Sequence, residues 1–373
     1  MNHIASTASL TSHLNRPLVA DMSLALINRT GAYHVCREIA DGCTDLISAR
    51  RYWRLRRADV PRSHFGRVLA RLMMLEIDHP ALGRWLPARR GRDESILYMD
   101  PLYVLGEQPR PDDIVLCHDL GPVTHADLFD ASTGANYREA YERISRGRPG
   151  MVFVSEASRD AFVEVYGTDY PFLEVIPLFV RQHTHLDGGR APAGISGPFL
   201  LTVAALERRK NHVRSFRAFA DSGLAAKGYS YVFCGPRGNA TDEILAAAAA
   251  TPGVMRLGFV EEAELRWLYG NAAGFVLPSL LEGFGMPALE AAQYGLLSLI
   301  GSGAAQRAAV GDGAVVVDES SVASIAEGLR HLVGMDAMDR ARRIEKALAH
   351  AHSLTRGRFI AAWRALLESR VRA

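Results

Sequence analysis

The stretch Glu282-Gly-Phe-Gly-Met-Pro-Ala-Leu-Glu290 decides the fold that we expect for this chain. An apolar run, 272–281, leads into it and is typical of a buried parallel strand. Pro287 stands where a helix should begin, since its fixed φ suits the first turn and its missing N–H costs nothing there. Gly283 and Gly285 allow a sharp turn and the close approach of a ligand. The sequence therefore predicts a strand, a tight loop and a helix, whose first amides form an anion site.

A carboxylate stands at each end of this loop, at Glu282 and at Glu290. A loop that receives phosphate between two acids suits a ligand that carries both phosphate and hydroxyl groups. A nucleotide sugar is such a ligand. The alternative is a surface helix that starts at a proline, in which Glu290 merely complements the helix dipole.

Two glutamates with Gly-Phe-Gly-Met-Pro between them resemble the signature of the retaining glycosyltransferases of family 4. The resemblance implies the α/β GT-B fold, in which two Rossmann-like, doubly wound domains face a cleft and a C-terminal helix crosses back to the N-terminal domain. It implies that Glu282 contacts the donor sugar and that Glu290 binds the ribose hydroxyls. The remaining donor-binding residues that it implies in this loop are Gly283, Phe284, Gly285, Met286 and Pro287.

The length and composition of the chain suit this fold. With 373 residues it can form two domains of roughly 150–180 residues each. Its net charge of +2 argues against a dedicated nucleic-acid binder. The four cysteines show no metal-ligand spacing, so we expect reduced thiols. No run approaches the roughly 20 apolar residues that a membrane-spanning helix needs.

Composition shifts place the expected domain boundaries. Residues 1–16 are polar and predict a disordered lead-in, and 17–181 are expected to form the N-terminal, acceptor-side domain. A linker rich in Gly, Pro and His follows at 182–197. Residues 198–355 alternate strands with helices and are expected to bind the nucleotide sugar. The helix expected to cross back covers 356–373.

The basic segment Leu206-Glu-Arg-Arg-Lys-Asn211 joins an expected strand to an expected helix. It resembles the Leu-Glu-x-Arg-Lys-Asn loop of the same family, which implies that Lys210 grips the donor diphosphate. The family often has a further arginine at the position of Ala205, and Arg208 or Arg209 is expected to supply that charge. Lysine suits phosphate as a compact charge and arginine as a fork. The alternative is a basic loop that is simply solvated.

Two segments of the N-terminal half also resemble the family. His118 follows an apolar strand, 113–117, at its carboxyl end, where open α/β sheets place ligand contacts. The resemblance of His-Asp-Leu implies that His118 reaches the donor sugar. Gly31 lies in Arg29-Thr-Gly-Ala-Tyr33, which resembles a glycine-containing loop of these enzymes. The alternatives are a packing histidine and an ordinary strand-to-helix turn.

Residues 50–92 contain twelve arginines, with Tyr52, Trp53 and Trp85 among them. Basic side chains interleaved with aromatic ones can lie on an anionic membrane surface, where each basic residue contributes on the order of 1 kcal/mol. The alternative is a solvated basic helix face. The segment Arg50–Arg92 therefore predicts either contact with the inner face of the cytoplasmic membrane or an exposed basic surface.

The resemblance implies a cytoplasmic, retaining glycosyltransferase that moves a hexose onto a saccharide or a polyprenyl-diphosphate-linked saccharide in bacterial polysaccharide synthesis. The motifs are similar to those of bacterial mannosyl- and rhamnosyltransferases, which favours GDP-mannose as the donor. Because the chain has no Asp-x-Asp, we expect no metal or other cofactor. The catalytic residues that the resemblance implies are Glu282, His118 and Lys210. The alternatives are a UDP-glucose or deoxysugar-nucleotide donor, a nucleotide-sugar epimerase of the same fold, and a non-enzymatic arginine-rich scaffold.

Overall fold

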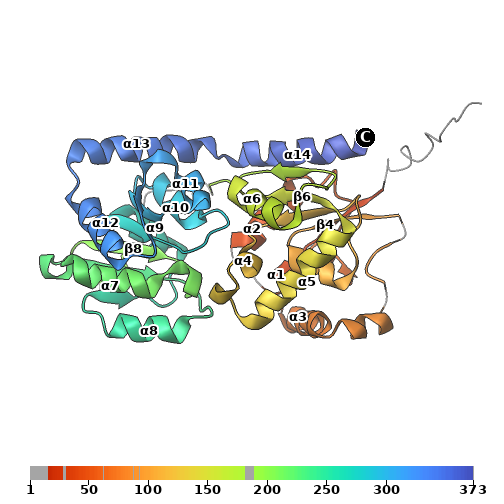
Figure 1. The fold of residues 1–373 in the computed structure, drawn as a ribbon, viewed down its shortest axis with the longest axis horizontal. Coiled ribbons are helices and arrows are strands. Elements are labelled where there is room, and N and C mark those ends of the chain that lie inside the picture. The colour runs from red at the N-terminus through yellow and green to blue at the C-terminus, as the bar shows by residue number, and fades with distance from the viewer. Residues whose placement is uncertain are drawn as a thin grey trace, which may run out of the picture. The chain divides into compact units, whose positions relative to one another are not determined.

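The computed structural model describes residues 16–27, 31–61, 63–86, 88–91, 93–180 and 189–372. Their contacts divide the chain into two compact units (Figure 1). Unit 1 comprises the described residues up to Leu120, Ser132–Ile176 and the residues from Gly357 onward. Unit 2 comprises Gly121–Ala131 and the described part of Pro177–Arg356.

Unit 1 is built on a seven-stranded sheet in the order β3-β2-β1-β4-β5-β6-β7. Neighbouring strands are parallel except β2 and β3, which form an antiparallel hairpin at one edge. The strands are β1 (Leu18–Asp21), β2 (Ala49–Tyr52), β3 (Leu55–Arg56), β4 (Ser95–Tyr98), β5 (Ile114–Cys117), β6 (Gly150–Phe153) and β7 (Leu173–Val175). The helices are α1 (Leu24–Ile27), α2 (Gly31–Gly42), α3 (Ser63–Asp78), α5 (Ala131–Gly147), α6 (Glu156–Tyr166) and α14 (Arg356–Arg372), with 3-10 turns η1 (Pro80–Trp85) and η2 (Pro101–Gly106).

Unit 2 is built on a six-stranded, all-parallel sheet in the order β10-β9-β8-β11-β12-β13. Its strands are β8 (Phe199–Val203), β9 (Ser230–Cys234), β10 (Val254–Arg256), β11 (Gly274–Leu277), β12 (Ser298–Gly301) and β13 (Val315–Val317). Its main helices are α7 (His212–Ser222), α8 (Thr241–Ala249), α9 (Glu262–Asn271), α10 (Met286–Gln293), α11 (Ala304–Val310), α12 (Val322–Gly334) and α13 (Ala337–Ser353). Helices α7, α8 and α12 lie on one face of the sheet and α9, α10, α11 and α13 on the other (Figure 1).

The strands of unit 2 are short apolar runs because helices cover both faces of a parallel sheet. Phe216 and Phe219 of α7 pack on Tyr231 and Phe233 of β9, and all four side chains are buried. Aromatic residues of this kind bury large apolar areas, so they anchor α7 on the sheet.

The strand order of unit 2 reverses between β8 and β11, because β9 and β10 continue to one edge and β12 and β13 to the other. In open α/β sheets, ligands bind outside the carboxyl ends of the strands at this switch point. The loop that follows β8 contains Lys210, and the loop that follows β11 contains Glu282. The fold therefore brings the loop that contains Lys210 and the loop that contains Glu282 to the same edge of the sheet.

The fold predicted from the sequence, with two doubly wound α/β domains and a returning C-terminal helix, is confirmed. The last helix, α14, belongs to unit 1, where Trp363 is buried. Arg364 of α14 pairs with Asp45 at 2.6 Å and donates to the carbonyl oxygen of Gly42. The cleft between the two domains stays a prediction.

The units differ from the expected domains at 121–131, at 177–180 and at Arg356, all of which belong to unit 2. Gly121–Ala131, which holds α4 (Gly121–Thr124) and η3 (Ala126–Leu128), lies within 17–181 of the sequence and yet belongs to unit 2. Arg208 donates to the carbonyl oxygen of Asp127 at 2.9 Å, which attaches η3 to the loop after β8. The expected lead-in, apart from Arg16, and most of the expected linker lie outside the described residues.

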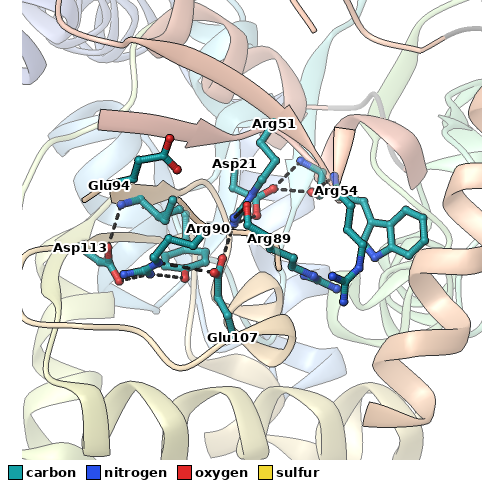
Figure 2. Close-up of polar contacts among 12 residues, drawn as sticks. Asp21, Arg51, Arg54, Arg89, Arg90, Glu94, Glu107 and Asp113 are labelled. Carbon is teal, nitrogen blue, oxygen red and sulfur yellow. Dashed lines mark hydrogen bonds and ion pairs between the residues drawn. The ribbon is translucent and has the colours of Figure 1, made fainter. Parts of the chain in front are cut away.

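The arginine-rich segment 50–92 forms a buried ion-pair network rather than a continuous basic face (Figure 2). Arg51 of β2 is fully buried and pairs with Asp21 at 2.7 Å and with Glu107 at 2.6 Å. Burial opposes the charge of Arg51, but the two carboxylates raise the pKa of its guanidinium above the usual value. Arg90 pairs with Asp113 at 2.5 Å.

A fourth acid, Glu76 of α3, accepts hydrogen bonds from three more residues of this segment. Its carboxylate accepts hydrogen bonds from Arg54, Arg89 and the indole N–H of Trp53. The expectation of an exposed basic surface is therefore wrong for Arg51, Arg54, Arg89 and Arg90. Glu76 lies in the segment itself, whereas Asp21, Glu107 and Asp113 lie outside it. Arg62 and Arg92 lie outside the described residues.

In the part of the chain that the structure describes, no helix combines the length and the apolar character needed to cross a membrane.

Candidate nucleotide-sugar site

The centre of the candidate site is an ion pair between Lys210 and Glu282 at the switch point of unit 2. The Lys210 Nζ atom lies 2.6 Å from Oε1 and 2.8 Å from Oε2 of Glu282. Both side chains are almost fully buried, at 9% and 6% exposure. A buried charge needs a partner because desolvation is costly, and here each group is the partner of the other.

Two further donors complete the surroundings of Glu282. Arg209 lies 3.4 Å from its Oε2, and the Ser279 hydroxyl donates to its Oε1 at 2.8 Å. Burial opposes ionisation of Glu282, but Lys210 and Arg209 hold the pKa of its carboxyl below the usual value. Burial and the charge of Arg209 lower the pKa of Lys210. The site thus concentrates two cations around one carboxylate.

Asn211 holds the loop after β8 against its neighbours. Its backbone has the left-handed conformation, with φ 62°, which asparagine tolerates better than most residues. Its side-chain amide donates to the carbonyl oxygens of Pro278 and Glu319, at 2.9 and 2.8 Å. The Leu280 amide also donates to the carbonyl oxygen of Arg209. These bonds join the loops after β8 and β11, so Lys210 and Glu282 are positioned together.

The loop after β11 leads into α10 as the sequence predicts. Gly285 precedes the helix with φ 106°, a conformation that favours glycine, and Pro287 is the second helical residue. Phe284 is buried, whereas Met286 and Pro287 are partly exposed. The helix α10 therefore begins at Met286, four residues after Glu282.

Glu290 lies one turn into α10 and is partly exposed. Its Oε2 accepts a hydrogen bond from the hydroxyl of Tyr269 at 3.3 Å. Burial and the charge of Glu290 raise the pKa of Tyr269 well above its usual value, so this phenol stays a donor. Tyr269 also belongs to unit 2, so the orientation of Glu290 is fixed by a residue of its own unit.

The other two predicted site residues, His118 and Gly31, lie in unit 1. His118 follows β5 and is partly exposed, and its Nε2 lies 3.2 Å from the carbonyl oxygen of Met99. Gly31 is the first residue of α2, and Asn28 to Thr30 lie outside the described residues. The structure therefore brings Lys210, Arg209 and Glu282 into contact, and the other predicted residues of unit 2, 283–287 and Glu290, follow Glu282 along the chain.

Sequence reasoning missed three residues that support this group. Ser279 contacts Glu282, Asn211 joins the two loops, and buried Gln306 donates to the carbonyl oxygen of Leu277 at 2.7 Å. The partners of Asn211 and Gln306 are far away in the chain, whereas Ser279 lies only three residues before Glu282. Only the position of Asn211 directly after Lys210 gave a signal.

The described residues hold no group of three or more His, Cys, Asp or Glu side chains that could bind a metal ion. The four cysteines are free and buried, as the sequence predicts for reduced thiols. Burial raises the pKa of Cys234 from 9.0 to about 12, so this thiol of β9 is not a nucleophile at neutral pH.

His212, next to the site, predicts a pH dependence of stability. Burial lowers the pKa of His212 from 6.5 to about 4, and its Nε2 donates to the carbonyl oxygen of Ala205 at 3.1 Å. The folded state favours the neutral ring, so stability is present above pH 6.5 and is lost as pH falls toward 4. Between pH 7 and pH 5 the free energy of unfolding should fall by about 2 kcal/mol more in the wild type than in His212→Gln. Urea unfolding at both pH values measures this difference, and equal losses would contradict a buried neutral His212.

Comparisons with known proteins agree with this site. Residues 193–350 match the sequence model of the family described as glycosyl transferases group 1. The O-antigen chain mannosyltransferase B of Escherichia coli is 31% identical over 131 residues, which are 34% of this chain and 34% of that protein. The serotype-specific mannosyltransferase WbdA of Escherichia coli is 28% identical over 207 residues, 50% of this chain and 25% of that protein. The matches thus span only about a third and a quarter of these curated relatives.

Solved structures agree over almost the whole chain. An α,α-trehalose-phosphate synthase (UDP-forming) from Burkholderia vietnamiensis has a TM-score of 0.67 at 16% identity, covering 95% of this chain and 98% of that chain. The synthase from Burkholderia xenovorans in complex with glucose-6-phosphate has a TM-score of 0.63 at 13% identity, covering 96% and 100%. At these identities the likeness concerns the fold alone.

The fold and the site together define a class of protein. The chain has the GT-B fold of glycosyltransferases, and its residues 193–350 form a group 1 glycosyltransferase domain. This domain and the two mannosyltransferase relatives support a glycosyltransferase enzyme, which confirms the resemblance predicted from the sequence.

Proposed function

We propose that the chain is a retaining hexosyltransferase that takes mannose from GDP-mannose and adds it to a saccharide or to a lipid-linked saccharide in bacterial polysaccharide synthesis. The observation that carries the proposal is the cluster of Lys210, Arg209 and Glu282 at the switch point of a group 1 domain. Two relatives, both mannosyltransferases, support the choice of mannose.

The geometry suggests how the residues would act on a nucleotide sugar. Breaking the bond between the sugar and the diphosphate leaves negative charge on the phosphate, and preorganised cations and amides stabilise such charge strongly. Lys210 and Arg209 would provide the cations, and the start of α10 the amides. In this structure both cations face Glu282. A diphosphate bound to them competes with this carboxylate and releases it toward the hydroxyls of the donor sugar.

Glu290 and His118 would have the roles that the sequence predicts for them. Glu290 would bind the ribose hydroxyls, and His118 would meet the donor sugar from unit 1. The retained configuration means that an α-linked donor gives an α-linked product, with the acceptor hydroxyl attacking on the side that the diphosphate leaves.

A UDP-glucose donor is the second candidate, because the solved structures with this fold include synthases described as UDP-forming. A thermal-shift series with GDP-mannose, UDP-glucose and a dTDP-deoxysugar separates these donors, since a bound ligand stabilises the folded state by mass action. We expect the largest shift with GDP-mannose. No shift with any of the three would count against the proposal.

Transfer should not require a metal ion. The chain has no Asp-x-Asp to hold a divalent ion at a diphosphate, and the basic loop at Lys210 can take that part instead. We expect the same initial rate of sugar transfer in EDTA and in magnesium or manganese. A rate that EDTA abolishes and magnesium restores would refute metal independence.

We further propose that the enzyme works at the inner face of the cytoplasmic membrane through an apolar stripe of α3. Seven of the twelve exposed large hydrophobic side chains in the described chain come from residues 65–86. Phe65, Val68, Leu72 and Leu75 lie on one side of the helix and are 45–49% exposed, and Trp85 is 89% exposed. Exposed Arg67 and Arg71 adjoin the stripe. Tryptophan beside basic side chains suits an anionic lipid surface, where a polyprenyl-diphosphate-linked acceptor would lie.

This surface predicts binding to anionic liposomes that weakens as salt rises, because the Debye length shrinks from about 10 Å at 0.1 M to about 3 Å at 1 M. The double variant Leu72→Ser, Trp85→Ser should lose most cosedimentation. Val165→Ser is the matched control, because Val165 is a similarly exposed apolar residue of α6. Equal binding by both variants would contradict a role for the stripe. Arg54 and Arg56 are poor test positions, since they pair with Glu76 and Glu94.

A further inference from the structure

The buried arginine network of unit 1 borders a pocket that the proposed sugar transfer does not use. The pocket has a volume of about 470 Å³, within the range of roughly 300–1,000 Å³ typical of small-molecule sites. Its charged lining consists of Arg54, Arg89, Arg90, Arg110 and Glu107. Figure 2 labels Arg54, Arg89, Arg90 and Glu107 among the polar contacts of this region.

Four of the five charged residues that line the pocket come from segments before β4 and β5, whereas Arg54 lies in the turn after β2. Arg89 and Arg90 precede β4, and Glu107 and Arg110 precede β5, so these residues lie near the amino ends of the two strands. His118 follows β5 at its carboxyl end. Because β4 and β5 are parallel, their amino ends share one edge and their carboxyl ends the other. Neither His118 nor Gly31, the predicted donor contacts of unit 1, is among the residues that line the pocket.

The charges around the pocket leave one cation uncompensated. Arg54 and Arg89 pair with Glu76, and Arg90 pairs with Asp113. Arg110 is exposed, and among the described residues its guanidinium makes no ion pair or hydrogen bond. An anion that enters the pocket thus meets an available guanidinium at Arg110.

The buried arginines also have unused hydrogen-bond capacity. Arg89 and Arg90 are 2% and 7% exposed, yet Nε of Arg89 and Nη1 of Arg90 have no hydrogen-bond partner among the described residues. Buried polar atoms of this kind usually meet a protein group, a water molecule or an ion. The acid partners hold both side chains in place. Binding of a ligand that supplies oxygen atoms therefore costs little conformational entropy for these side chains.

The backbone around the pocket is shaped to hold these guanidinium groups. A Cβ atom at Gly106 would lie 1.8 Å from Nη1 of Arg89, so the arginine rests against a residue that has no side chain. Gly83 similarly borders Glu76, since a Cβ there would lie 2.7 Å from its Oε1. The sequence thus keeps space beside both members of the Arg89–Glu76 pair.

We propose that this pocket binds a small phosphate ester, of the size of a hexose phosphate, in unit 1. The guanidinium fork matches phosphate oxygens, and Glu107 at the pocket wall can accept from sugar hydroxyls. Such a site is independent of whether unit 2 transfers a sugar.

Calorimetric titration with inorganic phosphate and with mannose 6-phosphate tests this site. The titrations use the full chain carrying Lys210→Ala, so that the basic loop of unit 2 does not contribute. We expect mannose 6-phosphate to bind, and Arg110→Gln to weaken its binding at least tenfold, as the loss of a hydrogen bond to a charged group implies. Arg57→Gln is the matched control, because Arg57 is an exposed arginine of unit 1 outside the pocket lining.

Three outcomes would overturn the proposal. One is no binding of either phosphate compound, and another is equal weakening by Arg110→Gln and Arg57→Gln. The third is binding of short-chain phosphatidic acid without binding of mannose 6-phosphate, which would assign the pocket to a lipid headgroup. The folding of Arg110→Gln is not at risk, since its side chain takes no part in the ion-pair network.

Discussion

Lys210→Ala should lower the turnover of sugar transfer by roughly 10²–10³-fold, the size expected when one stabiliser of developing charge is lost. Lys210 is buried beside Glu282 at the switch point of unit 2, where a leaving diphosphate would meet it. The variant should lower kcat because the charge on the leaving oxygen, which Lys210 would stabilise, grows in the transition state. Steady-state rates at saturating donor measure it.

Lys227→Ala provides the matched control, because Lys227 is an exposed lysine of the same unit that lies outside the site. Its turnover should equal that of the wild type. Glu290→Ala should instead weaken donor binding, since ribose contacts persist through the reaction. Near-normal turnover of Lys210→Ala at saturating donor would contradict the role of the basic loop.

Glu282→Ala should destabilise the protein by about 3–5 kcal/mol, because it leaves Lys210 as a buried charge without its carboxylate. Lys210→Ala should cost less, since Glu282 keeps Arg209 and Ser279 as partners. Urea unfolding at neutral pH gives both values.

The exposed glutamate Glu327 of α12 supplies the control for this comparison. Glu327→Ala should stay within about 0.5 kcal/mol of the wild type, as surface substitutions usually do. The double variant Lys210→Met, Glu282→Leu removes both charges and should recover much of the stability that Glu282→Ala loses. If Glu282→Ala and Glu327→Ala unfold alike, the ion pair does not stabilise unit 2.

The sequence predicted those parts of the site that depend on neighbouring residues. Gly285 and Pro287 predict the turn into α10. Lys210 lies in a loop between two apolar runs, which predict β8 and α7. The partner of Lys210 could not be predicted in this way. Glu282 lies 72 residues away, and only the parallel order of β8 and β11 brings the two together.

The arginine-rich segment shows the same limit of local reasoning. Its composition indicated an exposed basic surface, because Asp21, Glu107 and Asp113, which neutralise Arg51 and Arg90, lie outside the segment. Arg51 is 30 residues from Asp21, and Arg90 is 23 residues from Asp113. The hairpin of β2 and β3 places Arg51 inside unit 1, where burial without these acids would be too costly. The exposure of apolar side chains on α3, by contrast, depends on which face of this helix packs against the core of unit 1.

The central claim, that unit 2 transfers a hexose with retention, is tested most directly by the anomeric configuration of the product. The enzyme is incubated with GDP-mannose or UDP-glucose and a synthetic lipid-linked mannoside, and the new linkage is assigned by NMR. We predict an α-linked product from GDP-mannose, with one GDP released for each linkage formed. A β-linked product, epimerised nucleotide sugar or no consumption of either donor would contradict the account.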